Sequence, residues 1–307
     1  MSLLILTLAL AACGQGVSTP PDSNSEGTGQ RPLEIYTVNY PLAWGAKQLL
    51  GGAGQVRFPV PADIDPAFWQ PDLNEVVAFQ QADMILLNGA NYARWMSRVS
   101  LPDNRLVDSS RDFADRLIAV DTGPVHSHGP AGDHSHGGMA FTVWLDLDLY
   151  QRQLQTIATT VKSKLPQQAN SIAARESELI DKITEMDKAL MALGREFNGA
   201  PILYSHPVYQ YFGRRYQFNG RAMHWEPDQL PQQSDWSELH ALLEHHRAAV
   251  MLWEDDPMPE TRAALKALGV EVVVFRPMGK RPKEGDFLSG MTANIDRLKA
   301  YLHVRGA

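Results

Sequence analysis

One long helical pattern lies in the middle of the chain, in the segment Gln167–Phe197, QQANSIAARESELIDKITEMDKALMALGREF. Its apolar residues fall on one side of a helix, which makes it the strongest indication of the architecture. The segment has 31 residues and would be roughly 46 Å long at about 1.5 Å per residue. Pro166 separates it from an earlier apolar stripe between Tyr150 and Leu165. We predict a spine helix packed against two lobes, and a coiled coil with a partner is the alternative. The stripe repeats at spacings of 7, 4, 3, 4, 3 and 4 through Ile172, Leu179, Ile183, Met186, Leu190, Leu193 and Phe197.

On both sides of this spine, short β-rich runs alternate with helical patterns, which is typical of parallel α/β sheets. We therefore expect an α/β fold with two lobes, each a mostly parallel four-stranded sheet flanked by helices, joined by the rigid spine. The strands expected before the spine are Leu33–Val38, Val56–Val60, Met84–Leu87 and Arg105–Val107. Those expected after it are Ile202–Tyr204, Arg221–Met223, Ala249–Trp253 and Val270–Phe275. The expected helices include Asn74–Ala82, Trp236–His246, Glu260–Leu268 and Gly290–Leu302.

The composition excludes several classes of protein. Hydrophobic residues make up 44% and charged residues 21% of the 307 residues, as in an ordinary globular protein. The formal net charge of -7 argues against a nucleic-acid partner, since such binders carry a basic surface. A single cysteine allows neither an internal disulfide nor a cysteine-cluster zinc site.

The start of the chain is typical of an exported lipoprotein. Residues Ser2–Ala12 form an uncharged apolar run that is too short to span a bilayer but fits a signal peptide. The sequence Leu10–Gly14, LAACG, resembles a bacterial lipobox, in which the cysteine, here Cys13, receives the lipid. Residues Gly14–Pro32 lack large apolar side chains and suit a flexible tether. The alternative is a buried N-terminal helix with a core cysteine.

These patterns together divide the chain into five parts. We expect two lobes around the spine, with the signal peptide and tether before them. The parts are the signal peptide 1–12, the tether 13–32, the N-terminal lobe 33–165 with a His-rich loop at 124–138, the spine 166–197, and the C-terminal lobe 198–307.

The His-rich loop has the sequence PVHSHGPAGDHSHGG. Its glycines argue against a helix or a core strand. Neutral imidazoles bind zinc, copper and nickel, so two His-x-His pairs in one loop predict metal handling of modest affinity. A solvated low-complexity insertion without a role is the alternative. The four histidines are His126, His128, His134 and His136.

A second group of candidate ligands lies at the carboxyl ends of strands, where open α/β sheets bind their ligands. In the second lobe these ends carry His206, the pair His224-x-Glu226 and the run Glu254–Asp256. An imidazole next to carboxylates is the donor set of a nitrogen/oxygen metal site. Taken singly, His206 suits a turn, His224 a strand-end core residue, and the acidic run a solvated loop. In the first lobe, Asp63 and Asp65 are the ionisable candidates.

Several further motifs lie between Pro66 and Phe287. They are Pro66–Pro71 (PAFWQP), Gln81–Ile85 (QADMI), Phe141–Asp146 (FTVWLD), Ser205–Pro207 with Tyr211 and Phe212, Leu252–Glu254 and Gly285–Phe287. With the lipobox, the two expected lobes, the spine and the His-rich loop, these motifs make the chain similar to the zinc- and manganese-binding lipoproteins of metal ABC transporters. The resemblance implies two lobes that hold the metal between them through three histidines and an acidic residue. It also implies a periplasmic, lipid-anchored protein that captures a divalent metal and delivers it to a permease.

The resemblance carries over to only half of the family's ligand set. Two of the family's histidine positions fall on Ala67, which cannot bind a metal, and on Thr142, whose hydroxyl is a poor ligand for these ions. His206 matches the third histidine and Glu254 the acidic position. Asp65 often corresponds to an acidic family position, whereas His224 is a candidate from its place at a strand end alone. The expected ligands are therefore His206, Glu254, His224 and Asp65.

Two functions follow from these residues. In the first, a monomeric solute-binding lipoprotein carries a divalent ion, zinc in first place and Mn2+, Cu2+ or Ni2+ otherwise, to an ABC permease. In the second, no interlobe site exists, and the protein is a metal scavenger, chaperone or interaction module that uses its His-rich loop. An enzyme in which zinc activates water is a third interpretation, but the sequence contains no histidines and glutamate at the spacing of a HExxH-like motif. No enzymatic activity is therefore predicted.

Overall fold

The computed structural model describes residues 31–120, 126–127, 133–134 and 138–306. The chain from Pro32 onward forms one compact unit. None of the helices within these ranges has the length and apolar character that a membrane span needs. The predicted signal peptide, Cys13 and nearly all of the tether lie outside the described residues.

The first sheet is built from strands β1 to β4, which all run parallel in the order β2-β1-β3-β4. β2 ends earlier than predicted because Pro59 and Pro61 lack the backbone N–H that a continuing ladder requires. Strand β4, in contrast, begins and ends one residue later than predicted. The strands are β1 (Leu33–Thr37), β2 (Gly54–Arg57), β3 (Met84–Leu87) and β4 (Leu106–Asp108).

Two helices connect the strands of this sheet. Helix α1 (Tyr40–Leu50) begins at Asn39, whose side chain accepts a hydrogen bond from the Leu42 N–H at 3.1 Å. It ends at Gly51, which has a φ of 54°. Helix α2 (Leu73–Gln81) begins with a capping box formed by Asp72 and Glu75. Local capping therefore fixes where each of the two helices begins.

The second sheet repeats the topology of the first, with four parallel strands in the order β10-β9-β11-β12. The predicted fold class is therefore confirmed. The strands are β9 (Pro201–Tyr204), β10 (Asn219–Ala222), β11 (Val250–Trp253) and β12 (Glu271–Val274). The accompanying helices are α5 (Gln210–Tyr216), α6 (Gln233–His245), α7 (Pro259–Ala267) and α8 (Phe287–Gly306).

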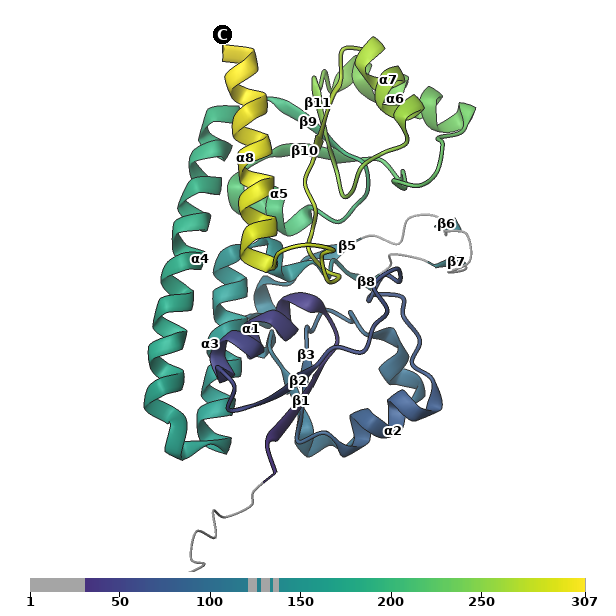
Figure 1. Ribbon diagram of the computed structural model, residues 1–307. Helices are drawn as coiled ribbons and strands as arrows, with labels where there is room; N and C mark the ends of the chain where they lie inside the picture. The colour runs from purple at the N-terminus through teal and green to yellow at the C-terminus, as the bar shows by residue number, and fades with distance from the viewer. Residues whose placement is uncertain (1–30, 121–125, 128–132, 135–137, 307) are drawn as a thin grey trace, which may run out of the picture. The chain divides into compact units, whose positions relative to one another are not determined.

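The helices α3 (Leu147–Lys164) and α4 (Ala169–Phe197) join the two sheets. A 3-10 turn at Pro166–Gln168 delays the start of α4 by two residues relative to the prediction. Most of the predicted apolar stripe of α4 is buried, with Met186 packed at the edge of the core. Helix α4 runs along both lobes (Figure 1), and it contacts α1 and α3 in one lobe and α5 and α8 in the other. The chain itself therefore covers the stripe.

One apolar core runs through both lobes. Buried side chains of β1, α4 and β11, among them Ile35, Ile183 and Leu252, belong to one contiguous cluster. Along β11, Leu252 points into this core, whereas Trp253 points into a smaller cluster with Trp225 on the other face of the sheet. The lobes are therefore packed together.

Hydrogen bonds from one lobe to the other add to this packing. The Tyr40 N–H donates to the Gly279 carbonyl oxygen at 3.0 Å, and the Trp144 indole N–H donates to the Pro277 carbonyl oxygen at 2.6 Å. The Tyr211 hydroxyl donates to the carbonyl oxygen of Ala140 at 3.0 Å. These bonds hold the two walls of the interlobe space in register.

The other elements within the described ranges are short. Two antiparallel pairs are formed by β5 (Ala119–Val120) with β8 (Gly138–Met139), and by β6 (His126–Ser127) with β7 (Asp133–His134). Further 3-10 turns lie at Arg94–Arg98, Asp103–Arg105, Arg111–Arg116 and Val143–Leu145.

Candidate metal centre

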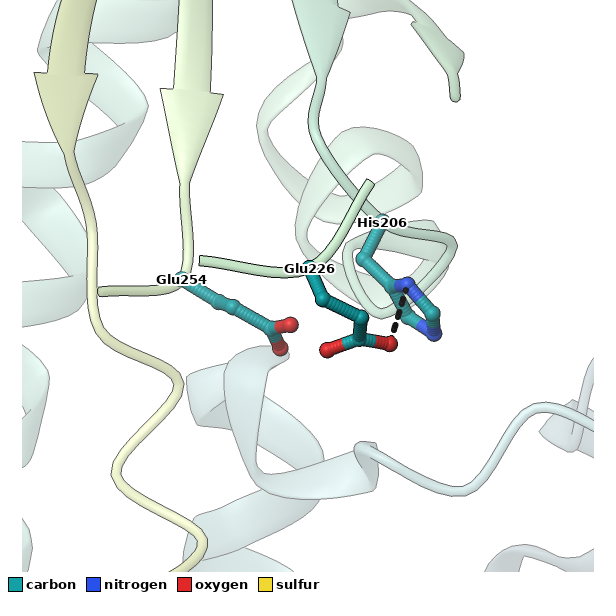
Figure 2. Close-up of side chains that lie close together, drawn as sticks. All are labelled: His206, Glu226 and Glu254. Atoms are coloured by element: carbon teal, nitrogen blue, oxygen red, sulfur yellow. Dashed lines mark ion pairs between the residues drawn. The ribbon is translucent and has the colours of Figure 1, made fainter. Parts of the chain in front are cut away.

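Three side chains with metal-binding atoms converge where strands of the second sheet end (Figure 2). They belong to His206, Glu226 and Glu254, and one ligand atom of each lies within 4.8 Å of the other two. His206 is buried, and both glutamates are partly exposed. In Figure 2 the three side chains point toward one another from separate strand ends. One imidazole and two carboxylates are a donor set for a divalent cation.

The backbone between β9 and β10 explains how His206 and Glu226 meet. The ladder continues past both strands, because the Met223 N–H donates to the Tyr204 oxygen at 2.8 Å and the Trp225 N–H donates to the Ser205 oxygen at 2.7 Å. The residues that follow, His206 and Glu226, therefore leave the sheet side by side.

Glu254 joins them from β11, the neighbour of β9 on its other side. The Ser205 N–H donates to the Leu252 carbonyl oxygen at 2.8 Å, which keeps the start of the β9 loop beside the end of β11. Glu254 follows Trp253, the last residue of β11, directly. Three neighbouring parallel strands thus deliver one ligand each to the same edge.

The spacing of His206 and Glu226 suits an ion between them. The Nδ1 of His206 lies 3.3 Å from Oε1 of Glu226. Two ligands of a tetrahedral zinc ion, each bound at about 2.0–2.2 Å, lie roughly 3.4 Å apart. The same geometry also lets Glu226 orient the imidazole so that the other ring nitrogen faces a metal. Both arrangements assign Glu226 to the site.

The electrostatic environment of Glu254 favours a cation. Burial raises the pKa of its carboxyl well above the usual value, and the neighbouring carboxylates of Glu226 and Asp65 raise it further. Lys280 acts in the opposite direction but does not reverse the shift. A divalent ion among these carboxylates would stabilise their charged forms.

The structure places the other two predicted ligands at the border of this group. Asp65 is exposed, and its Oδ1 accepts a hydrogen bond from the Ala67 N–H at 2.8 Å, although its charge reaches Glu254. His224 is also exposed, and its ring centroid lies 6.0 Å from that of His206. Neither is one of the three residues whose ligand atoms converge.

Glu226 is the ligand candidate that the sequence analysis did not select. Its signal was present as the second member of the pair His224-x-Glu226 at the end of a predicted strand. Side chains two residues apart in extended backbone point the same way, so the pair gave no criterion for choosing between them. The burial of His206 and its contact with Glu226 make that distinction.

On the first lobe, Ala67 and Thr142 are buried and bring no ligand. The hydroxyl of Thr142 donates to the Val208 carbonyl oxygen at 2.5 Å, so it ties the lobes together two residues beyond His206. The next residue after Ala67, Phe68, packs edge to face on Phe141 with ring centroids 6.5 Å apart. This wall of the interlobe space is therefore aromatic.

The His-rich loop is described only in part. His126 and His134 face each other as backbone partners in the β6–β7 pair. His128 and His136 lie outside the described residues. The metal-handling role of this loop stays a prediction.

Relatives with similar sequences are named as zinc proteins. The chain is 23% identical over 311 residues to the high-affinity zinc uptake system protein ZnuA of Bacillus subtilis, covering 97% of this chain and 95% of that protein. It is 22% identical over 278 residues to the zinc-binding lipoprotein AdcA of Streptococcus pneumoniae, covering 87% of this chain and 55% of AdcA. The chain thus spans just over half the length of AdcA.

Solved structures share the fold. The metal-dependent lipoprotein YcdH of Bacillus subtilis superposes with a TM-score of 0.74 at 20% identity, covering 87% of this chain and 98% of YcdH. The Zn(II)-bound ZnuA-like domain of Streptococcus pneumoniae AdcA gives 0.72 at 19% identity, covering 89% and 98%. FpvC of Pseudomonas aeruginosa in complex with Ni2+ gives 0.69 at 17% identity, covering 90% and 99%.

The decisive match is to a whole family and covers both lobes and the helices that join them. The family described as ZnuA, zinc-uptake complex component A, periplasmic, matches residues 35–301, and the chain belongs to this family.

Proposed function

We propose that this protein captures a divalent metal ion, zinc in first place, between its lobes and delivers it to an ABC permease. The observation that carries the proposal is the convergence of His206, Glu226 and Glu254 within 4.8 Å. The family supports it, because its description is that of an uptake component rather than an enzyme. The metal is then the cargo.

In this proposal His206, Glu226 and Glu254 hold the ion from the second lobe. Asp65 completes the shell from the first lobe, since its charge already acts on Glu254. His224 lies outside the shell, and its ring is a neighbour of the His206 ring. Water fills any position that the protein leaves open, as in other zinc sites with three protein ligands.

The donor set bears on which metal is bound. Carboxylates suit Mn2+ as well as Zn2+, and imidazole suits Zn2+, Cu2+ and Ni2+. The relatives' names favour zinc, while one structural neighbour was solved with Ni2+. We therefore expect zinc to bind, with less discrimination against Mn2+ than a site with three histidines would show.

Export and anchoring belong to the same proposal. The signal peptide 1–12 directs the chain across the membrane, and the lipid on Cys13 holds it there through the tether 13–32. The relative AdcA is itself named a lipoprotein. Lobes 33–165 and 198–307 with the spine 166–197 would act as a monomer outside the cytoplasm. Mass spectrometry of membranes tests this, since Cys13→Ser should remove the acyl groups and release the protein.

In the second candidate function, the His-rich loop binds metal and the interlobe site does not. The observation that favours it is that Ala67 and Thr142 bring no ligand to the first-lobe wall. The protein would then scavenge metal or act as a chaperone through the loop alone.

A zinc titration by calorimetry separates the two functions. The starting protein carries His126→Ser, His128→Ser, His134→Ser and His136→Ser, so that the loop cannot bind. We expect one zinc ion per chain to remain tightly bound and to be lost on Glu254→Gln, whereas the exposed-site control Glu244→Gln should bind normally. Loss of all tight binding in the starting protein would favour the second function.

A further inference from the structure

A cavity of about 740 Å3 lies along the open edge of the second sheet, away from the metal centre. Strand β12 forms its floor, helix α8 one wall, and Arg262 of α7 the other side. Its volume falls within the roughly 300–1,000 Å3 of pockets that bind small molecules. Nothing in the proposed function uses this cavity, which we call the β12 groove.

The β12 groove is cationic although the chain as a whole carries a net charge of -7. Four arginines line it, against two acidic residues. Asp256 pairs with Arg262 at 3.3 Å and with Arg276 at 2.6 Å, and Arg276 also pairs with Asp255 at 2.9 Å, so two of the arginines are engaged in ion pairs. The arginines of the groove are Arg262, Arg276, Arg297 and Arg305, and its acids are Asp256 and Glu271.

The other two arginines bind neutral oxygens. Among the described residues, neither Arg297 nor Arg305 has a carboxylate within ion-pair distance. Arg297 donates to the Asn294 side chain at 3.1 Å, and Arg305 donates to the Tyr301 hydroxyl at 2.6 Å. Burial and the nearby Arg276 lower the pKa of Arg297 more than the carboxylates of Asp256 and Asp255 raise it, and an anion beside the guanidinium would offset that shift. This half of the groove therefore holds two guanidinium groups that make no direct ion pair with the described residues.

The outward backbone groups of β12 face the groove. The N–H groups of Glu271 and Phe275 point inward to β11, so Val272 and Val274 point their backbone groups to the open edge. The carbonyl oxygens of Val272 and Val274 already accept hydrogen bonds from Arg262 at 3.4 Å and Arg297 at 3.3 Å. A strand added to this edge would need those carbonyl oxygens, whereas an oxyanion needs donors only.

The groove also has an apolar side. Ala300 and Val304 of α8 line it beside the ring of Tyr301, and Val304 is 77% exposed. An exposed valine at the rim of a cationic groove suits a ligand with an apolar body.

We propose that the β12 groove binds a small organic anion, whose carboxylate or phosphate oxygens accept hydrogen bonds from Arg297 and Arg305 while its apolar body lies along α8. The site stands independently of the metal centre, because the two share none of their residues.

Four probes test the ligand class by calorimetry with the purified protein. Hexanoate and hexyl phosphate carry both the anion and the apolar body, hexanol lacks the anion, and inorganic phosphate lacks the body. We expect one of the first two to bind at least about tenfold more tightly than hexanol and inorganic phosphate. The tighter of them identifies a carboxylate or a phosphate as the natural group. Equal binding of hexanol, or no binding of any probe, would overturn the proposal.

Variants of Arg297 and Arg305 locate the binding. Arg297→Gln and Arg305→Gln should each weaken the tighter probe about tenfold, because each removes a charged hydrogen bond. The control is Arg221→Gln, an exposed arginine on the opposite edge strand β10. Arg305 is exposed near the end of α8, so its replacement decides the question even if Arg297→Gln lowers the melting temperature. Unchanged binding in Arg305→Gln would place the probe elsewhere and refute the site.

Discussion

The two sheets of this protein share one strand order but end in different chemistry. In the second sheet, the residues after β9, β10 and β11 bring His206, Glu226 and Glu254 together. In the first sheet, the residues after β1 and β3 are Asn39 and Asn88, whose buried amides bond to each other at 3.0 Å. Equivalent topological positions therefore serve ligand binding in one lobe and internal hydrogen bonding in the other.

The amides of Asn39 and Asn88 are hydrogen-bonded within the first lobe. Asn39 also caps α1, and Asn88 donates to the Phe141 carbonyl oxygen at 2.8 Å. Neutral, satisfied groups do not attract a cation, whereas the crowded carboxylates around Glu254 do. The topology thus supplies the position, and the side chains decide its use. Metal binding is therefore expected in the second lobe.

The largest effect should come from removing the imidazole of that lobe. We expect His206→Ala to weaken zinc binding by at least about 100-fold, because a ligand is worth more than the 10- to 100-fold of an outer partner. Competition with a zinc-sensitive dye measures the change. The control His240→Ala removes an exposed histidine of α6 and should leave affinity unchanged. Equal affinities for the two variants would refute the assignment of His206.

A ligand added to the first lobe should reduce the difference between the lobes. We expect Ala67→His to strengthen zinc binding about tenfold, since it supplies a further nitrogen ligand next to Asp65. Gln70→His adds an exposed histidine in the same segment and serves as the control. An Ala67→His protein that folds but binds zinc no better would show that this wall does not face the ion.

Repulsion among the carboxylates around Glu254 should lower the stability of the metal-free protein. The pKa of Glu254 is raised in the folded chain, so the folded state holds a proton that the unfolded state releases, and stability falls as pH rises toward that pKa. Glu254→Gln should therefore melt several degrees higher than the parent at pH 7 without metal, and the gain should vanish below the ordinary pKa of 4.5. Glu244→Gln is the matched control in thermal melts, and an equal gain there would contradict the explanation.

The smallest effect concerns the tie between the lobes. Thr142→Val removes the donor to the Val208 oxygen and should cost about 1 kcal/mol, or roughly 2–4 °C in melting temperature. Thr160→Val, which loses only a bond within α3, should cost less. A destabilised Thr142→Val protein with unchanged zinc affinity would confirm that this residue is structural.

The sequence alone predicts most of the fold because periodicity and strand composition are local signals. The stripe from Ile172 to Phe197 and the run Met84–Leu87 were located to within two residues. Strand β2 ends earlier than predicted because of the prolines that follow it. Helix α1 is not among the predicted helices. Its start depends on the Asn39 cap, a single side-chain contact that periodicity does not report.

The candidate site was predictable only in part, because it depends on register between strands. His206 and Glu254 lie next to strand ends, and the sequence placed them correctly at one edge. Glu226 reaches His206 because the hydrogen-bond ladder between β9 and β10 continues to Trp225. How far that ladder extends depends on the pairing of the two strands and not on the local sequence. Whether Asp65 reaches the ion depends on the contact between lobes, which no local pattern encodes.

Anomalous diffraction at the zinc edge, from crystals grown with one equivalent of zinc, shows directly where the ion binds. We predict a single strong peak among His206, Glu226 and Glu254, with bonds of about 2.0–2.2 Å to one nitrogen and two carboxylate oxygens. A strong peak at the His-rich loop, with none among these three side chains, would contradict metal binding at the strand ends of the second sheet.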